Sequence, residues 1–213
     1  MMANGDSVVD VTIQPEELKA RLGVPHGAKG LVIFAHGSGS GRLSPRNNMV
    51  AAGLREAGLA TLLLDLLTPD EEEDRANVFD IPLLAGRLVR ASAWAMARPE
   101  LYGLPQGYFG ASTGAGAALL AAAQLGNSIA AVVSRGGRPD LAGAEALRRV
   151  TAPTLLLVGS RDEPVIALNR SAMEQMSAPH ELVIVPDATH LFEEAGTLDQ
   201  VVTHAIRWFI GHF

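Results

Sequence analysis

Short apolar runs alternate with amphipathic stretches along most of the chain. Most of the runs are apolar throughout, which is typical of strands buried on both faces of a parallel sheet. The stretches between them place apolar residues at helical spacing, and this alternation predicts an α/β fold with helices on both faces of the sheet. The predicted central strands are Gly30 to His36, Ala60 to Leu66, Gly107 to Ala111, Ala130 to Ser134, Pro153 to Gly159 and Glu181 to Val185.

Two further strands are predicted near the start of the chain, at Ser7 to Ile13 and Leu18 to Val24. The connection around Pro15 and Glu16 is short, and a short turn can join only antiparallel strands. We therefore expect this pair to be antiparallel and to form one edge of the sheet.

Five helices are predicted between and after these strands. The last is the clearest, because Leu198, Val202, Ala205, Phe209 and Phe213 fall on one helical stripe that can pack on the sheet. The predicted helices are Pro45 to Ala57, Ile81 to Ala97, Thr113 to Leu125, Val165 to Met176 and Leu198 to Phe213.

Two segments leave room for additional structure beside the predicted central strands. Thr68 to Asp74 (TPDEEED) is a run of charge that we interpret as a solvated loop. Neither Thr68 to Asp80 nor Ser134 to Ala146 is long enough to form a lid domain, so an open site is expected.

Length and composition narrow the class of protein. The chain has 213 residues, of which 48% are hydrophobic and 19% charged, as in a soluble globular protein with a single domain spanning 1–213. A net charge of -6 argues against nucleic acid as a partner. The absence of cysteine excludes disulfides and thiolate chemistry. No leader or membrane-spanning pattern is present, so a cytoplasmic protein without a membrane partner is expected.

The segment Gly107 to Gly116 reads GYFGASTGAG and contains the pattern G-x-S-x-G. The pattern is short, but here a predicted strand leads into it and a predicted helix follows, which is the context of a nucleophilic serine. A serine on such a sharp turn projects its hydroxyl from the end of the sheet, and the strained backbone requires small neighbours. Ser112 is the candidate nucleophile. The alternative is that Ser112 only caps the helix.

A second glycine-rich turn, HGSGSG, follows the strand that ends at His36. Backbone N–H groups in such a turn and directly after the nucleophile can stabilise a developing oxyanion. The candidate donors are the N–H groups of Ser38 and Thr113. We expect His36 to brace the turn rather than to act as the catalytic base.

The same turn also suggests a dinucleotide-binding unit, but its spacing does not fit. Starting from Gly37 or Gly39, the pattern G-x-G-x-x-G/A requires a small residue where the chain has Arg42 or Ser44.

Two later strands end close to residues that complete a triad. Asp162 follows one strand and His190 follows the next, and the order serine, aspartate, histidine fits a hydrolase of this kind. Both residues lie at the carboxyl ends of parallel strands, on the same edge as the candidate nucleophile. The alternatives are that Asp162 caps the following helix, that His190 is an ordinary loop residue, and that Asp187 or Asp140 supplies the acid.

Two arginines follow another buried strand, in the segment Ser134 to Arg138 (SRGGR). Arg135 and Arg138 are candidates for holding a substrate carboxylate. An ion pair with Asp140 or Asp162 is the alternative that we favour.

The segments FAHGSGSG, GYFGASTG, VGSRDEPV and ATHLFEE, together with the order of elements, resemble the dienelactone hydrolase-like branch of the α/β-hydrolase superfamily. The resemblance implies an α/β-hydrolase fold with a mostly parallel eight-stranded sheet, and hydrolysis of esters, lactones or thioesters. True dienelactone hydrolases use a cysteine nucleophile, whereas this chain has Ser112. That difference puts the dienelactone substrate itself in doubt.

The sequence thus predicts a serine hydrolase that acts on a small ester-like molecule through a covalent acyl-enzyme on Ser112, with His190 as base and Asp162 as its partner. This chemistry needs no metal and no organic cofactor. An acyltransferase or perhydrolase with the same triad is one alternative, and a catalytically silent binding protein with the same fold is another. Oligomeric state and natural substrate are not determined by the sequence.

Overall fold

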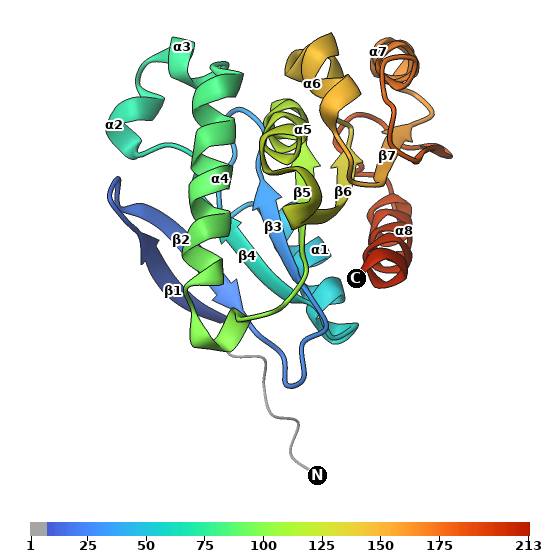
Figure 1. Cartoon of the computed structure of the whole chain (residues 1–213). Helices are drawn as coiled ribbons and strands as arrows, with labels where there is room; N and C mark the ends of the chain where they lie inside the picture. The colour runs from blue at the N-terminus through green and yellow to red at the C-terminus, as the bar shows by residue number, and fades with distance from the viewer. Residues whose placement is uncertain (1–7) are drawn as a thin grey trace.

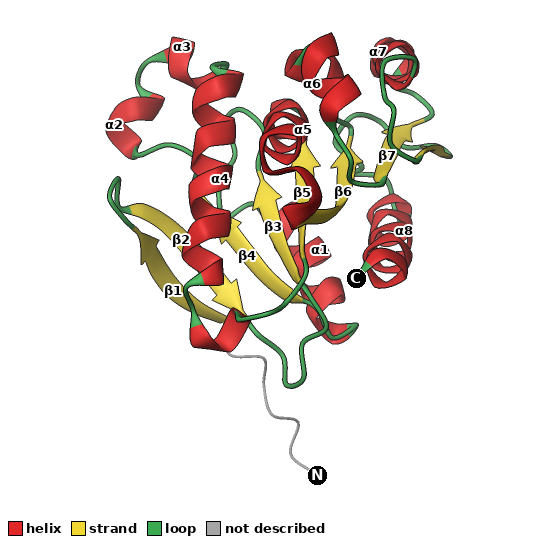
Figure 2. Cartoon of the chain, in the orientation of Figure 1, coloured by secondary structure: helices red, strands yellow, loops and turns green. Residues whose placement is uncertain are grey.

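A computed structural model describes residues 8–213 as one eight-stranded sheet with helices on both faces (Figure 1). The strands follow the spatial order β1-β2-β4-β3-β5-β6-β7-β8, and only β2 runs antiparallel to its neighbours (Figure 2). This is the mostly parallel α/β fold that the sequence predicts. The strands are β1 Val8–Ile13, β2 Leu18–Gly23, β3 Leu31–Ala35, β4 Ala60–Leu64, β5 Gln106–Ala111, β6 Ile129–Arg135, β7 Thr154–Gly159 and β8 His180–Val185.

The helices form two layers. α4, α5 and α6 lie on one face of the sheet, while α1 and α8 pack together on the other. Each layer has its own apolar core, because residues of the central strands alternate between the two faces. The helices are α1 Pro45–Glu56, α2 Pro69–Glu72, α3 Arg75–Val78, α4 Ile81–Met96, α5 Thr113–Leu125, α6 Ala144–Arg149, α7 Glu163–Met173 and α8 Thr197–His212, with 3-10 turns at Pro99–Leu101, Gly126–Ser128 and Pro139–Ala142.

Four of the central strands are buried over their whole length, as their apolar sequences require, whereas β8 at the edge of the sheet is largely half-buried. All residues of β3, β4, β5 and β7 are buried. Since β3 and β5 to β8 are parallel, the loops that leave their carboxyl ends meet at one edge of the sheet. That edge carries every predicted catalytic residue.

The predicted strands and long helices are all present, with boundaries that differ by a few residues. The opening pair is antiparallel and lies at the edge of the sheet, as expected. Ser7, predicted as the start of the first strand, lies outside the described residues. On α8, Leu198, Ala205 and Phe209 are buried, and Val202 and Phe213 pack against the same core.

One prediction is wrong. The acidic segment from Thr68 to Asp74 is not a solvated loop throughout, because α2 begins at Pro69 and α3 follows it. Thr68 caps α2: its Oγ1 accepts the N–H of Glu71, and the Glu71 carboxylate accepts the N–H of Thr68. This reciprocal pair is a capping box, and it outweighs the repulsion among the neighbouring carboxylates. The pattern T-x-x-E in the sequence was the signal for it.

No helix among residues 8–213 is long and apolar enough to cross a membrane. Within the same range the chain adds no large lid domain to the sheet and its helices.

Candidate active site

Ser112 occupies a strained turn between β5 and α5. Its backbone has φ 50° and ψ -124°, a left-handed conformation that costs a non-glycine residue about 1–3 kcal/mol. The turn is held by three backbone hydrogen bonds: Ser112 N–H donates to Arg135 O, and Ser112 O accepts the N–H groups of Ala115 and Arg138. The Ser112 side chain makes no capping bond to α5, so it is free for chemistry and the capping alternative is wrong.

The glycines on either side of Ser112 are required by close packing. A Cβ on Gly110 would lie 2.5 Å from Ala115 Cα, and a Cβ on Gly114 would lie 2.2 Å from Ala35 O. Both neighbours are backbone atoms, which cannot move aside cheaply. The G-x-S-x-G spacing therefore reflects a turn pressed between β3, β5 and the first turn of α5.

His190 and Asp162 are directly bonded. Nδ1 of His190 lies 2.6 Å from Oδ2 of Asp162. The Asp162 side chain is 13% exposed and the His190 side chain 39% exposed, so the acid is shielded while the imidazole reaches solvent. Asp162 stands at the start of α7 but makes no side-chain capping bond, and the capping alternative is wrong here too.

The two alternative acids are engaged elsewhere. Asp187 pairs with Arg161 at the surface, 3.0 Å away. Asp140 accepts two hydrogen bonds from Nε and Nη2 of Arg138. The imidazole of His190 therefore has Asp162 as its carboxylate partner.

Ser112 and His190 lie on either side of the end of β6. Ser112 bonds to the carbonyl of Arg135, and His190 Cε1 lies 3.6 Å from the position that a Cβ on Gly136 would take. The described chain has no hydrogen bond between Ser112 Oγ and His190 Nε2. Such bonds are often long in unliganded hydrolases and tighten when substrate binds.

The loop that carries His190 is ordered by Glu194, a residue that the sequence analysis did not identify. The Thr189 N–H donates to Glu194 Oε2 at 3.0 Å, and Thr197 Oγ1 donates to Glu194 O at 2.7 Å. The hydrogen bond from the Thr189 backbone lowers the pKa of Glu194. The residue before the histidine is thus held by a hydrogen bond to the Glu194 carboxylate.

The two predicted oxyanion donors are neighbours. Ser38 N–H donates to Thr113 Oγ1 at 3.1 Å, so the turn after β3 touches the start of α5. Thr113 is the first residue of α5, and its own N–H has no partner within the helix. The Thr113 N–H is therefore available in this structure, while the Ser38 N–H is engaged by the threonine hydroxyl.

His36 braces this turn, as predicted. It is 7% exposed, its Nδ1 lies 2.9 Å from Gly37 O, and its Nε2 accepts the N–H of Leu66 at 3.0 Å. Both ring nitrogens are used in holding β3 to the segment after β4, so this histidine has a structural role.

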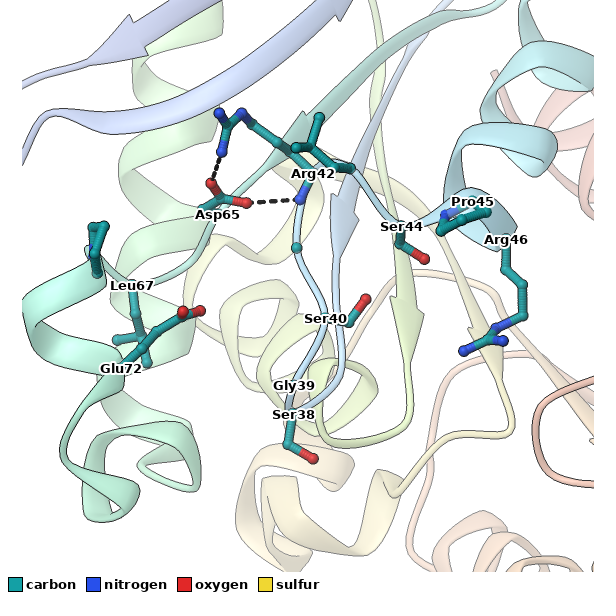
Figure 3. A pocket seen from close by; sticks show the side chains of 13 residues that line it. Ser38, Gly39, Ser40, Arg42, Ser44, Pro45, Arg46, Asp65, Leu67 and Glu72 are labelled. Atoms are coloured by element: carbon teal, nitrogen blue, oxygen red, sulfur yellow. Dashed lines mark hydrogen bonds and ion pairs between the residues drawn. The ribbon is translucent and has the colours of Figure 1, made fainter.

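A cleft of about 570 Å³ opens beside the turn after β3 (Figure 3). A smaller cavity of about 120 Å³ shares part of its wall and reaches Thr113. On one side Asp65 accepts hydrogen bonds from the backbone and side chain of Arg42 (Figure 3). Leu67 and Glu72 line both cavities, so the segment around α2 forms a shared wall of the two.

The two candidate substrate-binding arginines differ in their surroundings. Arg138 is paired with Asp140, which is the ion-pair alternative favoured from the sequence. Arg135 is 8% exposed, and its Nε and Nη1 are buried without a hydrogen-bond acceptor in the described part of the chain.

Among residues 8–213 no group of three or more histidine, aspartate or glutamate side chains is arranged to hold a metal ion.

The chain is similar to proteins of known structure. A crystal structure of dienelactone hydrolase from Anabaena variabilis ATCC 29413 is 54% identical, covers 98% of both chains and superposes with a TM-score of 0.92. Est1E from Butyrivibrio proteoclasticus covers 96% of this chain and 98% of its own with a TM-score of 0.81, and at 17% identity it shows a likeness in fold.

Curated relatives from two strains of Mycobacterium tuberculosis are 56% identical over 207 residues and are named "Putative phosphoribosyl transferase". The match covers 97% of this chain but 46% of theirs, so the chain spans about half the length of these relatives. Residues 18–205 match the dienelactone hydrolase family, and the strand order is that of its α/β-hydrolase fold. The chain therefore belongs to the dienelactone hydrolase family.

Proposed function

We propose that this chain is a serine hydrolase that cleaves ester, lactone or thioester bonds of small molecules. The observation that carries the proposal is the 2.6 Å bond between His190 Nδ1 and Asp162 Oδ2, beside a serine held in a strained turn. A positioned carboxylate, imidazole and hydroxyl at one edge of a parallel sheet form the arrangement that activates a serine for acyl transfer. Membership in a hydrolase family supports the same conclusion.

In the proposed mechanism Ser112 Oγ attacks the substrate carbonyl while His190 Nε2 accepts its proton. Asp162 holds Nδ1–H of the imidazole, which directs Nε2 toward the serine and stabilises the cation that forms. His190 then donates the proton to the leaving oxygen or sulfur, and an acyl-enzyme remains. Water attacks the acyl-enzyme, again with His190 as base, and releases the acid.

The developing oxyanion lies against the N–H groups of Thr113 and Ser38 in this mechanism. Because the Ser38 N–H is bonded to Thr113 Oγ1 in this structure, that hydroxyl has to rotate away as the oxyanion forms. The exchange replaces a neutral acceptor with a charged one, which makes the hydrogen bond from Ser38 stronger in the transition state than in the free enzyme.

The substrate class follows from the site and from the relatives. The cleft of about 570 Å³ is not lined by Ser112, His190 or Asp162, but it adjoins the smaller cavity that reaches Thr113, and its volume is within the usual range for small-molecule sites. The relative from Anabaena variabilis bears the name dienelactone hydrolase. The mycobacterial relatives bear a transferase name, but for proteins more than twice as long as the part that matches this chain. The hydrolase proposal rests on residues that this chain itself contains.

The experiment is a comparison of purified wild-type protein and Ser112→Ala on p-nitrophenyl acetate, p-nitrophenyl octanoate, a γ-lactone and an acyl thioester. The proposal expects wild-type turnover of at least one of these substrates, with the free acid as product and no turnover by the variant. A product in which an added alcohol or peroxide has captured the acyl group in preference to water would favour acyl transfer instead. No turnover and no acyl-enzyme by mass spectrometry would favour a binding protein.

A further inference from the structure

The smaller cavity beside the candidate nucleophile is apolar on one side. Leu67, Val78 and Leu84 line it there, from the segment after β4, from α3 and from α4. Leu67 and Leu84 are buried and Val78 is half-buried, and all three belong to or pack against one apolar core. The opposite side is formed by the turn after β3 and by Thr113, whose N–H is a candidate oxyanion donor. A substrate carbonyl held at this N–H can therefore place one of its substituents against an apolar surface.

The strand order shows which half of an ester faces this cavity. Ser112 follows β5, with β3 and β4 on one side of that strand and β6, β7 and β8 on the other (Figure 1). His190 follows β8, and a leaving group has to lie on that side to receive its proton. The cavity lies on the opposite side, at the turn after β3, where a Cβ on Gly37 would be 2.9 Å from Ser112 Cβ. The acyl half of an ester therefore lies on the side of the cavity.

The volume of the cavity limits the acyl chain that it can hold. At about 120 Å³ it has room for roughly four water-sized groups of about 30 Å³ each, and hence for a chain of about four carbons. Figure 3 shows Glu72 beside Leu67, and both residues line this cavity as well as the large cleft. A longer chain that leaves the cavity for the cleft meets this carboxylate, which is costly to remove from water.

The segment 69–78, which contains α2 and α3 and is called the α2–α3 wall below, is held in place by one carboxylate. Neither helix contains a buried residue. The Glu71 side chain of α2 accepts a hydrogen bond from Arg87 Nη2 at 2.5 Å, and the Glu71 carbonyl accepts one from Asn77 Nδ2 of α3 at 2.9 Å. Arg87 is buried on α4, and its Nη1 is paired with Glu16 at 2.5 Å. The pair of Glu71 with a buried arginine thus fixes α2, and α3 with it, relative to α4.

We propose that the smaller cavity is an acyl pocket that selects short apolar chains of about four carbons, and that Arg87 and Glu71 set this limit by fixing the α2–α3 wall. This rests on the hydrolase function proposed above and narrows its substrate class to esters and thioesters of short apolar acids. Leu67, Val78 and Leu84 contact the chain and determine its length. Arg87 and Glu71 do not line the cavity, so they are positioning residues that act through Val78.

Kinetics with p-nitrophenyl acetate, butanoate, hexanoate and octanoate test the pocket. In the wild type kcat/KM should rise by about 10-fold from acetate to butanoate, because each buried CH₂ contributes about fourfold, and should fall by at least about 10-fold from butanoate to octanoate. Val78→Phe fills the cavity and should lower the ratio of kcat/KM for butanoate over acetate by at least about 10-fold. The matched control is Val89→Phe, at a half-buried valine of α4 that lines neither cavity, and it should leave this ratio as in the wild type.

Glu71→Gln tests the positioning role without changing the lining of the cavity. The glutamine can still accept the Thr68 N–H and keep the capping box, while Arg87 keeps its pair with Glu16. The α2–α3 wall is then no longer tied to α4 by an ion pair, and the ratio of kcat/KM for octanoate over butanoate should rise by about 10-fold. Glu73→Gln removes an equal charge at the exposed end of α2 and should leave the ratio as in the wild type.

Binding of neutral amides tests the pocket without any turnover. In the Ser112→Ala background, butanamide at millimolar concentration should raise the Tm more than acetamide does at the same concentration, because its longer chain fills the cavity. Adding Val78→Phe should remove this difference. Because this measurement needs no hydrolysis, it reports on the pocket even where the proposed activity fails.

Each part of the proposal has its own contrary result. Equal kcat/KM for butanoate and octanoate in the wild type, or a chain-length profile that Val78→Phe leaves unchanged, would overturn the acyl pocket while leaving the hydrolase proposal intact. Equal losses on all four esters in Glu71→Gln would assign Glu71 a structural role and overturn its positioning role. Where no ester is hydrolysed, the hydrolase proposal fails and the amides decide: a larger Tm rise with butanamide that Val78→Phe removes supports the pocket, and equal Tm values with the two amides overturn it.

Discussion

Asp162 and His190 are separated by 28 positions in the sequence, and yet Oδ2 of the one lies 2.6 Å from Nδ1 of the other. They come from the loops after β7 and β8, which are adjacent and parallel in the sheet. The contact therefore follows from strand order, since parallel neighbours bring the loops at their carboxyl ends together.

Asp162→Asn tests what this contact contributes to activity. The amide keeps the side-chain volume but no longer holds the imidazole in the tautomer that accepts the serine proton. Loss of kcat by about 10³ to 10⁴-fold is expected, by analogy with serine proteases, while the Tm changes by only a few degrees. Steady-state kinetics and a thermal melt on the same sample measure the two effects. A fully active variant would transfer the acid role to another residue.

Substitution of the two histidines near the site should have different effects, on stability for His36 and on activity for His190. His36→Ala leaves the buried N–H of Leu66 without its acceptor, and we expect a loss of about 1–3 kcal/mol in the free energy of unfolding. His190→Ala removes the proposed base, with a loss of at least about 10³-fold in kcat and little change in stability. Urea unfolding measures the loss of stability in each variant, and steady-state kinetics measure the loss of kcat. An active His190→Ala protein would mean that the wrong histidine has been named.

Glu194→Gln should remove a pH-dependent contribution to the stability of the loop around His190. The Thr189 backbone N–H lowers the pKa of Glu194 below its reference value of 4.5 in the folded protein. A carboxyl with a lowered folded-state pKa stabilises the fold above pH 4.5 and loses that contribution as the pH falls through the lowered value. The wild type should therefore melt at a higher temperature than Glu194→Gln at pH 7, and the difference should vanish in acid. Glu145→Gln, at the exposed start of α6, controls for the loss of a surface charge.

Gly114→Ala tests the packing of the nucleophile turn. The added Cβ would lie 2.2 Å from Ala35 O, so the variant should be several kcal/mol less stable or fail to fold. Gly86→Ala in the middle of α4 is the matched control, because its Cβ would meet no atom within 4 Å. That variant should gain about 0.5–1 kcal/mol in helix stability. Equal Tm values for the two variants would contradict the close packing of Gly114.

Much of this site was predictable from the sequence because its residues lie in the loops that follow the parallel strands. Ser112, Asp162 and His190 each follow such a strand, and the parallel order brings them to one edge. The helix α2 was missed because five consecutive acidic residues, 70–74, suggested a solvated loop, and only the Thr68 to Glu71 capping pattern indicated otherwise.

Side-chain partners across the fold were less predictable. The pairing of Arg46 with Glu193 joins residues 147 positions apart, and no local pattern indicates it. The role of Glu194 in ordering the loop of His190 could have been inferred only from its position shortly after that histidine.

Labelling with a fluorophosphonate tests the central claim most directly, because only a serine hydroxyl beside a base and an oxyanion site attacks phosphorus rapidly. The wild type should gain one phosphonyl group on the intact protein, peptide mapping should place it on Ser112, and Ser112→Ala should remain unlabelled. Rapid labelling that persists in Ser112→Ala, or a folded wild type that does not react, would contradict the assignment of Ser112 as the nucleophile.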